Sequence, residues 1–169
     1  MARTLAERSG ADYLKVGLAP LLERISLYHG DVAGMAAEFE QLLEQRRQVE
    51  AGSSAFVADR SPADMLAIWL ALQDGPEAGK LTAALHAACA RHMAGYGMIV
   101  IPPFGVFPLR PKDAGQPGVR NLQPWVQLLS HGLITGLALH FVGMQKVLSI
   151  PRDLPPDAWC DFVLARVPG

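Results

Sequence analysis

Hydrophobic residues recur every three or four positions between Val32 and Val49, which is the spacing of one face of an α-helix. The other faces of this segment carry glutamate, glutamine and arginine. A stripe this narrow predicts a helix that packs on the protein's own core or, alternatively, docks a partner or a second copy. The stripe consists of Val32, Met35, Phe39, Leu42 and Val49, and Arg46 occupies its one charged position.

Five further stretches show helical periodicity together with capping residues. With the striped helix they predict a mainly α fold, a compact helical domain of about five to six helices that residues 1–169 form as a single domain. The first of these five predicted helices begins near Ser9 and Asp12 and ends near Gly30. The other four run from Ser61-Pro62 to Gly75, from Pro76 to about Met93, from Pro124 to about Ser149, and from Pro155-Pro156 onward.

Residues 97–111 interrupt the helical pattern, because they hold four prolines and two glycines but a single charge. We expect a short β-hairpin or an extended apolar segment around residues 97–108, with residues 98–101 as a buried strand that pairs with residues 55–58. Two interpretations of this segment stay open. In the first, the segment is a connector that packs over the protein's own helices. In the second, it is an extended arm that buries the side chains of Phe104, Phe107 and Leu109 in a partner.

The composition limits the function classes to which the chain can belong. With 50% hydrophobic and 18% charged residues, the chain can bury enough apolar area to fold, which excludes intrinsic disorder. A formal net charge of −1 provides no basic surface for phosphates, so no nucleic acid partner is expected. Residues 1–80 hold twelve of the sixteen acidic residues, whereas residues 92–109 and 121–145 carry no charge, so the second half is expected to be the more buried.

The chain has only two cysteines, and its N-terminus contains no continuous apolar segment, so we expect the protein in the reducing cytoplasm.

Residues 121–145 are uncharged and long enough to cross a bilayer, and Gly132 and Gly136 within them form a GxxxG pair. Polar residues are scattered through this run, however, and its apolar centre at residues 133–144 is short for a membrane span. We therefore expect a buried helix rather than a membrane span, and peripheral association with a membrane stays open.

One local cluster has the residue types of a metal site. His86, Cys89 and His92 follow one another at intervals of three on a predicted helix and suit zinc or copper. A single helix cannot easily aim all three at one ion, because His86 and His92 point about 120° apart. A pair completed from elsewhere, by His131 or His140, is one alternative. The competing interpretation places Cys89 in the core and gives the histidines hydrogen bonds at its boundary.

The sequence contains no nucleophile elbow, dinucleotide fingerprint or phosphate-binding loop. Low charge, the one-sided stripe and the proline-rich segment predict a non-catalytic interaction subunit, adaptor or chaperone-like component of a bacterial-type multi-subunit assembly. Its partner would be another protein or a second copy, and no cofactor is expected. The alternative is a small helical metal- or ligand-binding protein or enzyme that uses residues 86–93, with zinc or copper as its cofactor.

Overall fold

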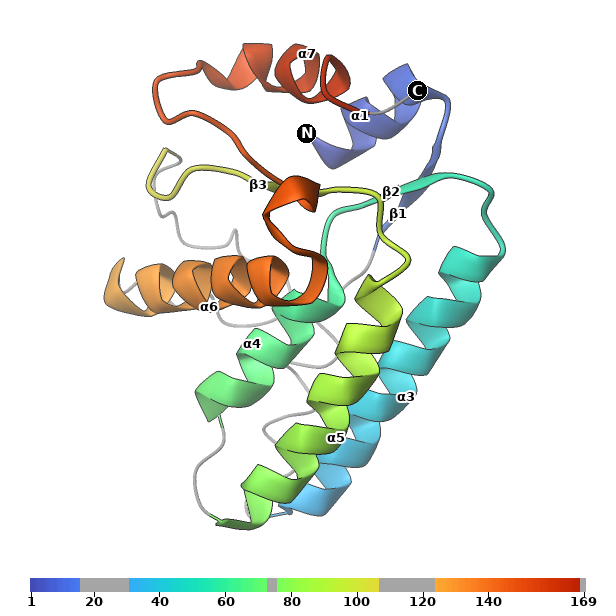
Figure 1. Cartoon of the computed structure of the whole chain (residues 1–169), viewed down its shortest axis with the longest axis vertical. Helices are drawn as coiled ribbons and strands as arrows, with labels where there is room; N and C mark the ends of the chain where they lie inside the picture. Colours follow the sequence, from blue (N-terminus) through green and yellow to red (C-terminus); the bar gives the residue numbers. More distant parts are fainter. Residues whose placement is uncertain (16–30, 73–75, 107–123, 168–169) are drawn as a thin grey trace, which may run out of the picture.

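Helices α3, α4 and α5 form a bundle that α6 crosses, and the short strands separate this bundle from helices α1 and α7 (Figure 1). The computed structural model describes residues 1–15, 31–72, 76–106 and 124–167. The fold is mainly α, as predicted. In chain order the described elements are α1 (Ala2–Ser9), β1 (Asp12–Leu14), α3 (Val32–Ala51), β2 (Phe56–Ala58), α4 (Pro62–Leu72), α5 (Pro76–Met93), β3 (Ile99–Ile101), α6 (Pro124–Val142), the 3-10 helix η1 (Met144–Lys146), β4 (Val147–Ser149), the 3-10 helix η2 (Pro156–Ala158) and α7 (Trp159–Leu164).

Capping residues explain where two of the bundle helices begin. The Asp31 side chain accepts a hydrogen bond from the backbone nitrogen of Gly34 at 2.8 Å, which satisfies a free donor in the first turn of α3. At the start of α4, the Asp64 carboxylate accepts a hydrogen bond from the backbone nitrogen of Ser61 at 2.7 Å. Pro62 occupies the first helical position, where its missing donor is not needed. Both starts agree with the sequence prediction.

Two glycines with positive φ angles end helices at positions that the sequence does not predict. Gly10 has a φ of 71° and terminates α1, so Ser9 ends a helix and Asp12 begins strand β1 instead of a helix. The rest of that predicted helix lies outside the described residues. Gly143 has a φ of 77°, so α6 stops at Val142 and the chain continues into β4.

The strands form two parallel pairs, and the predicted pairing of residues 98–101 with residues 55–58 is wrong. Strand β3 pairs with β4, with Ile99 opposite Val147, and β2 pairs with β1. No hairpin forms between described strands. The physical reason is the connection, because α6 lies between β3 and β4, as α3 lies between β1 and β2, and a helical crossover joins parallel strands.

The core of the bundle lies between α3, α4 and α5. Trp69 on α4 has no exposed surface, and its ring meets Phe39 of α3 edge to face at a centroid distance of 5.5 Å. The indole nitrogen of Trp69 donates a hydrogen bond of 2.7 Å to the Thr82 hydroxyl on α5. One residue of α4 therefore contacts both neighbouring helices.

The hydrophobic stripe on α3 faces this core, which corrects its interpretation as a partner-binding surface. Met35 and Phe39 are buried, and Val32 and Leu42 pack partly buried against the same cluster, so a partner cannot reach the centre of the stripe. Val49 differs from the others because 58% of it is exposed.

Candidate functional site

Helix α5 directs the three predicted metal ligands to three different places. Cys89 is buried and its thiol donates to the Pro62 carbonyl at a sulfur–oxygen distance of 3.6 Å. His92 bonds to Glu50 of α3, whereas His86 faces α6. Among the described residues, no group of three His, Cys, Asp or Glu side chains converges on a point that could hold a metal ion. The local cluster is therefore not a three-ligand site, because one helix spreads its side chains around its axis.

The structure does bring His86 together with His140, the pairing that the sequence left open. Their Nε2 atoms lie 3.1 Å apart, and the two residues come from α5 and α6. Phe141 contacts both rings, at centroid distances of 4.9 Å and 5.3 Å. His131 lies elsewhere on α6, with its ring 5.7 Å from the half-buried Phe104. Phe107 and Leu109 of the predicted docking arm lie outside the described residues.

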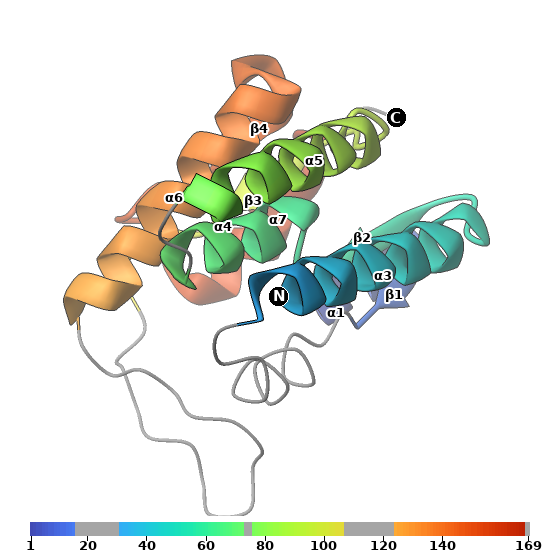
Figure 2. The ribbon, with the colours of Figure 1, turned by 90° about the horizontal axis from the view of Figure 1, so that it is seen from below.

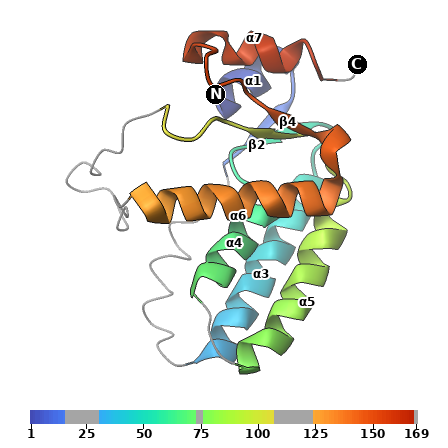
Figure 3. The same cartoon turned by 60° about the vertical axis from the view of Figure 1, so that its left-hand side comes forward.

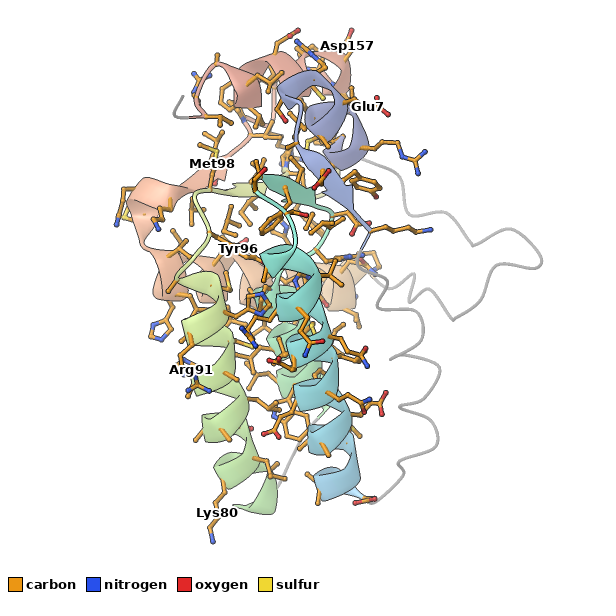
Figure 4. The ribbon with its side chains drawn as sticks, turned by 90° about the vertical axis from the view of Figure 1, so that its right-hand side faces the viewer. Glu7, Lys80, Arg91, Tyr96, Met98 and Asp157 are labelled. Carbon is orange, nitrogen blue, oxygen red and sulfur yellow. The ribbon has the colours of Figure 1, made fainter. Side chains whose placement is uncertain are left out.

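A polar network is buried where the C-terminal ends of α3 and α5 meet, beside Tyr96 (Figure 4). Arg46 donates through Nε to Glu50 at 2.6 Å and through Nη2 to the Tyr96 hydroxyl at 2.9 Å and to the carbonyl of Arg60. The Tyr96 hydroxyl donates to Glu50 at 2.7 Å, and His92 donates through Nε2 to the second Glu50 oxygen at 2.6 Å. We call these groups the Arg46 network. It ties α3 to α5 and to the segment that precedes α4.

The network sets the charge states of its members. Burial alone would raise the pKa of Glu50, but hydrogen bonds from His92 and Tyr96 and the charge of Arg46 outweigh it, so the pKa lies below its ordinary value. Burial raises the pKa of the Tyr96 hydroxyl and raises that of the neighbouring Cys89 thiol to about 12. Tyr96 is therefore a neutral donor, and Cys89 is a thiol rather than a nucleophilic thiolate.

The arrangement of the Arg46 network suits a structural role. A histidine bonded to a carboxylate can act as a general base only if a reacting group can reach its other face. The side chain of His92 is only 7% exposed, and within the described part of the chain its hydrogen bonds involve no hydroxyl or thiol. The network therefore fastens α3 and α5 together.

A shallow groove of about 660 Å³ runs between α3 and α5 next to His92. Its rim carries both signs of charge, from Glu40, Glu44, Arg47 and Arg91, the last of which Figure 4 labels on α5. Arg47 and Glu44 pair with each other at 2.7 Å. Because these charges oppose one another, the groove offers no uniform field that would select an anionic or cationic ligand.

The depressed pKa of Glu50 predicts a pH-dependent contribution to stability. Its carboxylate is favoured in the folded state, so its contribution is present above the unfolded pKa of about 4.5 and is lost as the pH falls through the lower folded pKa. We expect the stability difference between the wild type and Glu50→Gln to shrink from about pH 5 to about pH 3. Urea unfolding at each pH measures this difference. Glu40→Gln, an exposed change on the same helix, is the control, and a difference independent of pH would contradict the assignment.

Helix α6 exposes an apolar face, contrary to the expectation that the uncharged second half is buried. Only Ala138 and Val142 of this helix are buried. Trp125 is 76% exposed, and a Cβ atom added at Gly132 or Gly136 would meet nothing within 4 Å. We call this surface the α6 apolar face, and it comprises Trp125, Leu128, Leu129, Gly132, Gly136 and Leu139.

Among the described residues, α6 alone is long and apolar enough to cross a membrane. Ala138 and Val142, however, pack into the core that β3, α4 and the end of α5 share. The C-terminal half of α6 therefore cannot be surrounded by lipid in this fold. This packing agrees with the prediction that residues 121–145 do not form a membrane span.

Comparisons of the chain with protein-family models, with curated proteins and with solved structures found no match.

Proposed function

We propose that the protein is a non-catalytic interaction subunit that associates with a second copy of itself through the α6 apolar face. The exposure of this face carries the proposal, because contiguous apolar surface on a folded chain usually marks an interface. Trp125 is 76% exposed, Leu129 58% and Leu128 49%. Figures 2 and 3 show the N-terminal half of α6 projecting beyond α4, where another helix can approach it.

The two glycines favour a helix as the occupant of this face. Gly132 and Gly136 lie one turn apart and leave a hollow between Leu129 and Leu139, and small residues at this spacing let two helix backbones approach closely. No formal charge lies between residues 124 and 142 to oppose the contact.

A second copy of α6 meets these requirements. The helix spans residues 124–142, so Gly132 and Gly136 lie close to its centre. An antiparallel pair related by a two-fold axis would place the glycines of both copies at the crossing point, and would set Trp125 of each copy against the C-terminal half of the other. Such an isologous contact closes after two chains and leaves no open face for further growth.

Light scattering coupled to size exclusion tests the proposal. The wild type is expected at twice the chain mass of 18.2 kDa. The double variant Gly132→Leu/Gly136→Leu is expected to weaken association at least about thirtyfold. The two added leucine side chains would lie at the centre of the interface and keep the two helix backbones apart. Its monomer should stay folded, since both positions face open space and leucine favours a helix more than glycine does.

Gly79→Leu on α5 is the matched control, because an added Cβ atom there also meets open space and the position lies outside the α6 apolar face. It should leave the dimer intact. A wild type that is monomeric at about 100 μM would overturn the proposal, and so would a dimer that the double variant does not weaken. A monomer that binds phosphatidylcholine vesicles through Trp125 would assign the face to a membrane surface instead.

A further inference from the structure

We propose that His86 and His140 form a binding site for one divalent transition-metal ion, Zn²⁺ or Cu²⁺, which links α5 to α6. Neutral imidazole nitrogens are ligands that both ions accept. The two residues are 54 positions apart in the sequence, and the fold alone brings their Nε2 atoms to 3.1 Å. This site differs from the α6 apolar face in its residues and in its ligand.

The distance between the two nitrogens fits chelation of one ion. With nitrogen–metal bonds of about 2.0–2.1 Å, a nitrogen separation of 3.1 Å gives an angle at the metal of about 95–102°. This value lies between the right angle of a square-planar Cu²⁺ site and the wider angle of tetrahedral Zn²⁺. To bind an ion, each ring turns so that its Nε2 lone pair points about 40° off the line between the two nitrogens.

Packing around the pair holds the helix backbones that carry the two histidines. Leu85, which precedes His86, is 1% exposed, and Val142, two residues after His140, is 7% exposed. Phe141 lies against both imidazole rings. The backbone positions are therefore fixed before a metal arrives, and this lowers the entropy that binding has to overcome.

The remaining coordination positions would be filled by water. Cys89 and His92 are engaged in the core and in the Arg46 network, so they cannot turn toward the pair. No third metal-ligating side chain of the described residues joins it. His140 is exposed, which gives an ion access from solvent. A site with two protein ligands binds more weakly than a structural zinc site with four.

Metal binding exchanges one interaction for another without net loss of a proton. Without metal, one Nε2–H donates to the other Nε2 across the 3.1 Å gap. To bind the ion, the donor ring moves its proton to its own Nδ1 by exchange with water, so that both Nε2 lone pairs face the metal. The ion then bonds to both helices, which stabilises their contact against unfolding.

Isothermal titration of the metal-stripped full chain with ZnCl₂ and with CuCl₂ tests the site. The wild type is expected to bind one ion per chain, and His86→Ala and His140→Ala should each weaken binding at least about tenfold. His131→Ala, a histidine of α6 outside the pair, should bind as the wild type does. Zn²⁺ should raise the unfolding temperature of the wild type and of His131→Ala but of neither pair variant.

The same titration with Gly132→Leu/Gly136→Leu separates this inference from the proposed dimer. One ion per chain should still bind, because both ligands belong to one chain. Absence of saturable binding in this variant and in the wild type would overturn the inference. Equal binding by the wild type and His140→Ala would also overturn it, because the ion would then be held elsewhere.

Discussion

Replacing Arg46 with alanine is expected to lower the free energy of unfolding by about 3–5 kcal/mol, because it removes one partner of a buried ion pair. The Arg46 side chain is only 2% exposed, and that of Glu50 7%. The substitution leaves the Glu50 carboxylate without its cation and leaves the carbonyl of Arg60 without its donor. The Glu50 carboxylate is removed from water, so no solvent bond replaces the one it loses. Chemical denaturation at neutral pH measures the change.

Arg47→Ala is the matched control, since this neighbouring arginine forms an exposed pair with Glu44 on the same helix. It should change stability little, because solvent screens such a pair. The double variant Arg46→Met/Glu50→Met should be less destabilised than the sum of the two single variants, since no lone charge stays buried. If Arg46→Ala and Arg47→Ala have equal effects, the buried network contributes nothing to stability.

Replacing Trp69 with alanine is expected to destabilise the protein by about 3–5 kcal/mol. Trp69 has no exposed surface, so its removal leaves a large cavity between α3, α4 and α5. The change also removes the edge-to-face contact with Phe39 and the hydrogen bond to Thr82. Thermal unfolding followed by circular dichroism measures the effect. Thr82→Val keeps the Trp69 ring but removes both its hydrogen bond and the one that the Thr82 hydroxyl donates to the Ala78 carbonyl, and should cost about 1–2 kcal/mol.

Trp125→Ala is the control for this second prediction, because it removes the same side chain from a position that is 76% exposed. Measured at concentrations at which the chain is monomeric, it should change the stability by no more than about 0.5 kcal/mol. A loss as large as that of Trp69→Ala would mean that Trp125 is buried in the folded monomer. Trp125 would then not belong to the α6 apolar face.

The Arg46 network explains why a charged residue occurs in the hydrophobic stripe of α3. Arg46 occupies a position that faces inward, where a nonpolar residue would ordinarily lie. Its side-chain partners are Glu50 on the same helix and Tyr96 after α5, and His92 of α5 joins the network through Glu50. The spacing of four residues from Arg46 to Glu50 places this pair on one face of α3. That spacing is the signal from which this part of the network could have been inferred, whereas Tyr96 lies beyond the end of α5.

The sequence by itself determined the helical class, the capped starts of α3 and α4 at Asp31 and Ser61, and the end of α5 near Met93. These features depend on residues within one or two turns of each other, so local pattern is sufficient to predict them. The exposed face of α6 depends on tertiary packing, because composition shows that residues 124–142 are apolar but does not show what covers them.

Only the tertiary structure decided which distant residues meet. The parallel pairing of β3 with β4, the contact of His92 with Glu50 and that of His86 with His140 each join segments more than 40 positions apart. Local helix and strand propensity carries no information about such contacts. They form only when whole helices pack against each other, because this packing brings together side chains that are far apart in the sequence. For this reason the three candidate ligands on α5, which lie within seven residues of one another, separate in the fold: Cys89 belongs to the core, His92 to the Arg46 network and His86 to a pair with α6.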